Sequence, residues 1–186
     1  MQTKTAARAG VASHEIASSA LLIALLAVSC MFTVPLGPVP FTLQTAVVIL
    51  VALLCTPRQS ALVVGAYLLM GVIGLPVFSG MTGGPGKLLG PTGGFLIGFL
   101  VSATLAALLR GLIAKRTARN IVGDIVAAAC VIIVSDVFGL IWFMFVTQSD
   151  AASAFLVSTA PFIIPDCCKA VLAIIVATAV RKGLRK

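Results

Sequence analysis

The sequence has few ionisable side chains for its length. Its 186 residues include five acids and one histidine, and only 10% of them are charged. Enzymes need a nucleophile with a general base beside it, or paired acids, and no such set stands out here. A single histidine does not build a metal site, and the HExxH motif is missing. We therefore expect no catalytic residues, no metal and no cofactor.

The sequence also lacks a nucleotide-binding motif. The glycine-rich stretch 80–88 contains Lys87, but Met81 and Leu88 stand where a phosphate-binding loop needs glycine and Ser or Thr. The chain therefore carries no ATPase of its own. Its net charge of +8 does not indicate nucleic-acid binding, because the cations lie in short clusters between apolar runs.

Apolar residues dominate what is present. They make up 60% of the chain, and the mean hydropathy is +1.19. A soluble domain of this size could not bury so much apolar surface, whereas lipid removes the difficulty. We expect one membrane domain over 1–186, all-α, with six transmembrane helices in a bundle. A span needs about 20 apolar residues between breakers. The expected spans are 16–34, 43–55, 60–73, 95–113, 121–146 and 162–180.

The ends of these spans predict an orientation. Of the 13 Lys and Arg residues, all but Lys87 and Lys169 fall on one side of a six-span topology. Cytoplasmic loops carry the excess of Lys and Arg. We therefore expect a multi-pass protein of the cytoplasmic membrane with both termini inside. Residues 1–15 form a cytoplasmic segment in this topology, and 181–186 form a basic tail.

Two outer stretches are rich in glycine and proline. Residues 34–40 hold three prolines, and 71–94 are dense in both residue types yet still apolar. Irregular backbone cannot face lipid, because its N–H and C=O groups would be unpaired. We expect ordered outer loops that are buried in protein or line a wet cavity.

Asp166 and Lys169 stand out as a pair near the start of the last span. Residues three apart share a helix face. Charges at the membrane edge are costly unless they are paired or bound to a polar group. Two interpretations stay open: a structural ion pair, or a ligand site in which Asp166 accepts N–H groups and Lys169 binds a carboxylate.

Three further polar or aromatic positions are candidate substrate contacts. Asp136 lies within the fifth span, where an acid is either functional or bridges to another helix. Trp142 follows on the same span and fits an outer aromatic belt equally well. Gln44 opens the second span, where its amide can pair with a ligand or with the glycine-rich loop.

Small residues recur at four-residue spacing. Gly90, Gly94 and Gly98 favour close helix packing inside the protein. Ala20 and Ala24 on the first span could pack internally or form a flat face that docks a partner protein.

Several stretches together resemble the BioY family, the biotin-binding S components of energy-coupling factor (ECF) transporters. They are 34–44 (VPLGPVPFTLQ), 74–80 (GLPVFSG), 83–86 (GGPG), 90–95 (GPTGGF), and 161–166 (PFIIPD) with Lys169. The resemblance implies a six-helix bundle whose site lies near the outer face, roofed by the loops after the first and third spans. It also implies assembly with a transmembrane T component and two cytoplasmic ABC ATPases.

The resemblance also implies residue roles. Asp166 and Lys169 take the positions of the family's acid and lysine, and Ala20 with Ala24 those of its docking motif. In the loop after the third span, Ser79 is the nearest candidate for a biotin contact, and we add Phe78 beside it.

Biotin suits the residues present. Its bicycle wants apolar walls, while its ureido ring and carboxylate want a few polar anchors, which Asp166, Lys169 and Gln44 can supply. We expect high-affinity biotin capture and uptake. An S component for thiamin or riboflavin is an alternative, but those ligands lack the carboxylate that Lys169 would bind. A second alternative is a small membrane enzyme that acts on lipid, but the sequence lacks the clustered His and acidic residues that such an enzyme would need.

Overall fold

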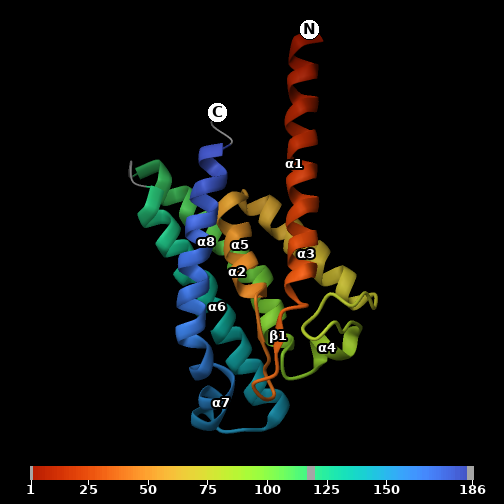
Figure 1. Cartoon of the computed structure of the whole chain (residues 1–186), viewed down its shortest axis with the longest axis vertical. Coiled ribbons are helices and arrows are strands. Elements are labelled where there is room, and N and C mark those ends of the chain that lie inside the picture. Colours follow the sequence, from red (N-terminus) through yellow and green to blue (C-terminus); the bar gives the residue numbers. More distant parts are fainter. Residues whose placement is uncertain (1, 117–119, 184–186) are drawn as a thin grey trace.

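The computed structural model describes residues 2–116 and 120–183. In chain order they form α1 (Gln2–Ser29), β1 (Thr33–Val34), β2 (Phe41–Thr42), α2 (Gln44–Leu54), α3 (Pro57–Val72), α4 (Pro85–Leu89), α5 (Gly93–Arg116), α6 (Asn120–Thr147), α7 (Ala151–Ser158), a 3₁₀ helix (Ala160–Phe162) and α8 (Ile163–Gly183). The start of α1 and the end of α8 lie at one end of the bundle (Figure 1). The β-strands, α4 and α7 lie at the other, which we call the loop end.

The helices match a membrane protein in length and composition. Within the described residues, three stretches are long and apolar enough to cross a bilayer: Gly93–Ala114, Ile121–Thr147 and Ala151–Gly183. The segment Glu15–Ser29 and the helix α2 are apolar but shorter. The expected helical membrane class is therefore confirmed, whereas a crossing by each of the six predicted spans stays a prediction.

The structure has two helices that the six predicted spans do not include, the short helices α4 and α7. Pro85 stands in the first turn of α4, where its missing N–H costs nothing. Asp150 caps α7 by accepting a hydrogen bond from the Ser153 backbone N–H, 3.1 Å away. Backbone hydrogen bonds of this kind, led by that of Ser153, lower the pKa of the Asp150 carboxyl.

The first outer loop corrects the all-α expectation. Thr33 pairs with Thr42, and Val34 with Phe41, in a two-stranded antiparallel ribbon. The first helix therefore ends at Ser29 rather than at residue 34. Between the strands Gly37 has φ +135°, a backbone conformation that side chains with a Cβ rarely adopt.

Hydrogen bonds join this ribbon to the second outer loop. The Thr33 hydroxyl accepts a hydrogen bond from the Gly80 N–H at 3.0 Å. Within the second loop, Phe78 and Thr82 exchange backbone hydrogen bonds of 2.9 and 3.2 Å. The two glycine- and proline-rich segments thus meet at the loop end.

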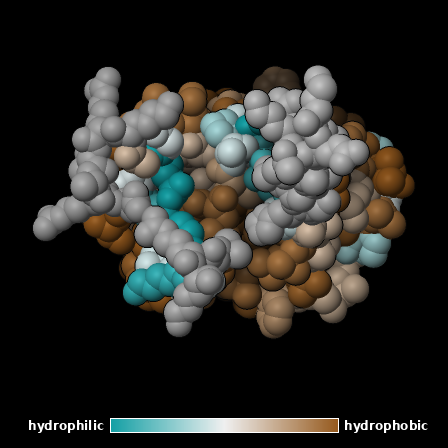
Figure 2. All heavy atoms as spheres, turned by 90° about the horizontal axis from the view of Figure 1, so that it is seen from above, coloured by the Kyte–Doolittle hydropathy of each residue, from teal (hydrophilic) through white to brown (hydrophobic). Residues whose placement is uncertain are grey.

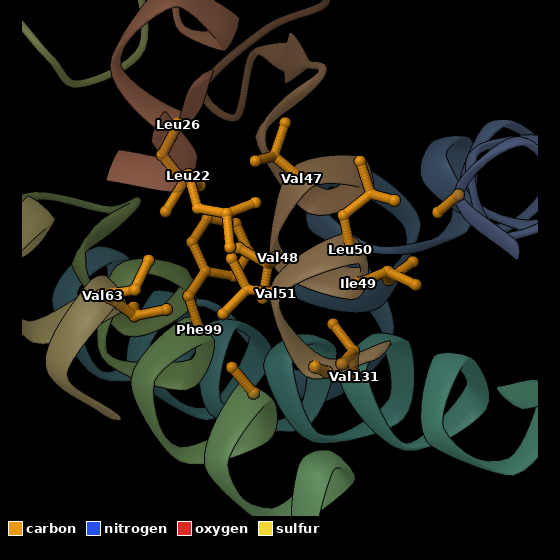
Figure 3. Packing of buried hydrophobic residues seen from close by; sticks show 14 of the residues in the cluster. Leu22, Leu26, Val47, Val48, Ile49, Leu50, Val51, Val63, Phe99 and Val131 are labelled. Atoms are coloured by element: carbon orange, nitrogen blue, oxygen red, sulfur yellow. The ribbon is translucent and has the colours of Figure 1, made fainter. Parts of the chain in front are cut away.

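The helix α2 forms the centre of the core. Its residues from Ala46 to Leu53 are all buried, as is typical of a helix surrounded by other helices. Figure 3 shows its side chains among those of the neighbouring helices. The labelled partners are Leu22 and Leu26 of α1, Val63 of α3, Phe99 of α5 and Val131 of α6.

Glycines on α5 allow close packing against α6, as expected. A Cβ added at Gly94 would collide with Trp142 and with the backbone oxygen of Phe138. One at Gly98 would lie 2.9 Å from the Cα atom of Ser135. Conversely, the ring of Phe95 occupies the space beside Gly139.

A charged cluster joins three helices near the end that carries the chain termini. Asp124 of α6 accepts a hydrogen bond from Arg110 Nε of α5 at 2.7 Å. Both terminal nitrogens of Arg181 on α8 also bind the Asp124 carboxylate, at 3.1 and 2.5 Å. Seen from this end, hydrophobic residues form much of the outer rim, and hydrophilic ones lie further inward and at one place on the edge (Figure 2).

Candidate functional site

A cavity that is partly open to solvent lies at the loop end. Its wall is built from the first outer loop, the starts of α2, α5 and α8, the middle of α6, and Ser79 of the second loop. The lining residues are Val39, Pro40, Thr42, Gln44, Thr45, Ser79, Thr92, Phe95, Leu96, Phe99, Ser135, Asp136, Phe162, Asp166 and Lys169. Six of these residues are aliphatic or aromatic and nine are polar or charged. A concave site that combines apolar walls with placed polar groups is typical of small-molecule binding.

Asp166 and Lys169 form an ion pair in the first turns of α8, with Nζ 2.7 Å from Oδ1. Both side chains are only 6% exposed, although both line the cavity. The Lys169 ammonium also lies 4.0 Å from the centre of the Phe41 ring, a favourable cation–π contact. The ion-pair interpretation is thus observed, and the position in the cavity wall leaves the ligand interpretation open.

Gln44 fixes the second outer loop to the core. Its Nε2 donates to the Tyr67 hydroxyl and, at 3.4 Å, to the carbonyl oxygen of Val77. Tyr67 donates in turn to the same carbonyl at 2.9 Å, and Gln44 Oε1 accepts from Thr42. Of the two interpretations of Gln44, pairing with the loop is the one observed, while the residue also lines the cavity.

Asp136 faces the cavity from the middle of α6. Among the described residues no hydrogen bond or ion pair to its carboxyl group is found, so it does not bridge to another helix there. The adjacent Ser135 hydroxyl is occupied, because it donates to backbone oxygens of Val131 and Ile132. Asp136 is therefore a polar group left open to a ligand.

Phe78 and Trp142 do not reach the cavity, contrary to expectation. Phe78 is fully buried and packs edge-to-face on Tyr67, with ring centres 5.8 Å apart. Trp142 donates a 3.0 Å hydrogen bond from Nε1 to the Gly90 carbonyl oxygen. Both side chains instead hold the loops that form the wall. The sequence did not show this, because the periodicity of a helix does not reveal which neighbour a ring contacts. Ser79 does line the cavity.

The sequence analysis did not predict several of the residues that line the cavity. Thr92, Phe95 and Phe162 lie in stretches that carry the family resemblance, so the motifs contained a signal for them. Thr45 follows Gln44 and Ser135 precedes Asp136, so each is the neighbour in sequence of a predicted site residue. Phe99 had no signal, since its place in the wall depends on how closely α5 approaches α6.

Ala20 and Ala24 lie on α1 and are not part of the cavity wall. Both are exposed on the helix, whereas Leu22 and Leu26 of the same segment are buried in the core. The alanines therefore do not pack internally within the described residues.

Comparisons with known proteins identify the family of the chain. The BioY family profile matches residues 1–186. A probable biotin transporter BioY from Pyrococcus horikoshii is 36% identical over 165 residues, which cover 89% of this chain and 94% of that protein. Biotin transporter BioY2 from Lactococcus lactis is 38% identical, over 89% of this chain and 88% of that protein.

The fold agrees as well. A crystal structure of the S component for biotin from an ECF-type ABC transporter superposes with a TM-score of 0.86 at 30% identity. The superposition covers 93% of each chain. Sequence and fold thus lead to the same family of transport proteins, which are not enzymes. The chain belongs to the BioY family.

Proposed function

We propose that this chain captures biotin at the outer face of the cytoplasmic membrane for import, as the S component of an ECF transporter. The observation that carries the proposal is the cavity at the loop end. There a buried ion pair and Asp136, which has no partner among the described residues, lie beside aromatic side chains. The named relatives are biotin transporters, and the similar crystal structure is a biotin S component.

The cavity offers a place for each part of biotin. Phe95, Phe99 and Phe162 give the apolar surface that suits the bicyclic ring. Lys169 is the cation for the valerate carboxylate. Asp166 and Asp136 are the polar groups for the ureido ring, whose N–H groups donate and whose carbonyl oxygen accepts.

The ligand competition test uses the detergent-purified chain and labelled biotin. We expect unlabelled biotin to displace the label, and thiamin and riboflavin to leave it bound, because neither has a carboxylate for Lys169. Displacement by thiamin or riboflavin would favour another vitamin S component, and absence of biotin binding would contradict the proposal.

The proposed partners are a transmembrane T component and two cytoplasmic ABC ATPases. The support is the family itself and the exposed Ala20 and Ala24 on α1, where small side chains allow a second helix to approach closely in lipid. In the proposed topology both termini are cytoplasmic, and the start of α1 lies at the same end as the end of α8 (Figure 1).

Replacing both alanines by leucine tests the docking surface. We expect the double variant to lose co-purification with the T component while it still binds biotin. Ala152→Leu, an exposed alanine at the loop end, is the matched control and should keep both properties. Co-purification that survives in the double variant would contradict the docking surface, and loss of biotin binding as well would show that the two leucines disturb the fold.

A further inference from the structure

The cavity holds more negative than positive charge. Asp136 and Asp166 face a single cation, Lys169, which already contacts Asp166 at 2.7 Å. While the cavity is open, water can hydrate the unbalanced carboxylate. A ligand that fills the cavity removes this water, and an anionic ligand adds a second unbalanced charge.

Among the described residues, no further charged side chain lines the cavity to balance the excess. The helices packed on α6 are α2, α5, α7 and α8, and α2 carries no charged residue. Their remaining charged residues are Asp150 at the start of α7, the basic residues Arg110, Lys115, Arg116, Arg181 and Lys182 toward the opposite end, and Asp124 of α6 itself, which is paired there. Within the part of the chain that the structure describes, Asp166 and Lys169 are therefore the charged residues that share the cavity wall with Asp136.

We propose that binding of a carboxylate ligand in this cavity takes up one proton and that Asp136 holds it. The inference rests on the proposed function, since it assumes that the ligand is biotin with its ionised carboxylate. A buried group without a partner neutralises rather than remain charged. Asp166 keeps its charge because Lys169 donates to it, whereas Asp136 has no such donor among the described residues.

The proton has two consequences for binding. It keeps the charge of the occupied cavity the same as that of the empty one, because the proton offsets the charge of the ligand. It also makes Asp136 a hydrogen-bond donor, which suits the ureido carbonyl oxygen of biotin.

The sign of the pH dependence follows from linkage. Below the pKa that Asp136 has in the empty cavity, the proton is already present and affinity does not change with pH. Above it, each ligand must bring a proton, so affinity falls by up to about tenfold per pH unit. Biotin stays ionised throughout this range and adds no slope of its own.

Calorimetry of biotin binding in buffers of different ionisation enthalpy measures the protons taken up. We expect the number to be near zero at low pH, where Asp136 is already protonated in the empty cavity, and to rise towards about one at high pH, with weaker binding there. Asp136→Asn, which cannot titrate, should bind biotin with no uptake at either pH. Asp150→Asn, outside the cavity, should behave as wild type.

Biotin methyl ester tests the cause without any mutation. It brings no charge, so we expect wild-type protein to take up clearly fewer protons with the ester than with biotin. Equal uptake for both ligands, uptake that persists in Asp136→Asn, or biotin binding with no uptake at any pH would each overturn the inference and leave the proposed function standing. Failure to bind biotin at every pH would overturn both.

Discussion

Asp124 lies 1% exposed where α5, α6 and α8 come together. Its carboxylate satisfies Arg110 and Arg181, whose side chains are 20% and 23% exposed. Removing one partner of a buried charge pair leaves the other uncompensated, which is usually worse than never having had the pair. This residue therefore holds the three helices together at the end opposite the cavity.

Asp124→Asn should destabilise the protein without abolishing biotin binding. The loss expected for breaking a buried ion pair is about 3–5 kcal/mol, and we expect the lower part of this range because both arginines reach solvent. Thermal unfolding in detergent measures the change. Asp150→Asn is the control, since that exposed cap keeps a side-chain acceptor and should shift unfolding little. A variant as stable as wild type would show that Asp124 carries no structural load.

Residue by residue, the sequence predicted some of the site and missed the rest for identifiable reasons. Asp166 and Lys169 were predictable because opposite charges three apart on a span must meet. Asp124 was missed because its partners are distant in sequence and lie among the cations that mark the membrane side. Phe78 and Trp142 are absent from the cavity lining because the direction of a ring depends on the tertiary fold.

At the scale of elements, the contact of α5 with α6 sets the width of the cavity. Gly94 and Gly98 of α5 let α6 approach closely enough that Phe95, Phe99, Ser135 and Asp136 share one wall. The long helices were predictable from apolar runs bounded by Gly, Pro and charges. The strands β1 and β2 and the helix α7 were not, because they depend on local turn and cap geometry within loops.

Gly94→Ala should disturb this contact, because the added methyl group meets Trp142 and the Phe138 carbonyl. Overpacking of this kind costs about 1–3 kcal/mol, so we expect a lower unfolding temperature and weaker biotin binding. Gly111→Ala on the same helix meets nothing within 4 Å and should be neutral or stabilising, since alanine favours helix. Equal effects of the two substitutions would contradict this account of the packing.

For the whole molecule, the asymmetry of charge sets the proposed orientation. The cavity and its loops lie at one end, and the start of α1 and the end of α8 lie at the other (Figure 1). Sequence reasoning predicted this arrangement from the distribution of Lys and Arg, because charge bias is a property of loops that needs no tertiary contact. Charge bias does not fix the number of full crossings. That number depends on short helices such as α2, which is surrounded by other helices of the protein rather than by lipid.

Cysteine labelling in intact cells tests the orientation. In a cysteine-free background, Lys87→Cys should react with an impermeant reagent from outside, and Arg116→Cys only after permeabilisation. The background is needed because Cys167 and Cys168 are exposed. The opposite labelling pattern would reverse the topology and place the cavity on the cytoplasmic side.

The central claim is that the cavity recognises biotin at both of its polar ends, with Lys169 on the carboxylate. The most direct measurement is a calorimetric double cycle of ligand and variant, with biotin and its methyl ester on wild type and Lys169→Met. Loss of a buried charge partner costs about 2–5 kcal/mol, so biotin affinity should fall by roughly 30-fold or more. The ester should lose much less, whereas Asp166→Asn should weaken both ligands alike. Equal losses for biotin and ester in Lys169→Met would show that Lys169 serves only as the ion-pair partner of Asp166.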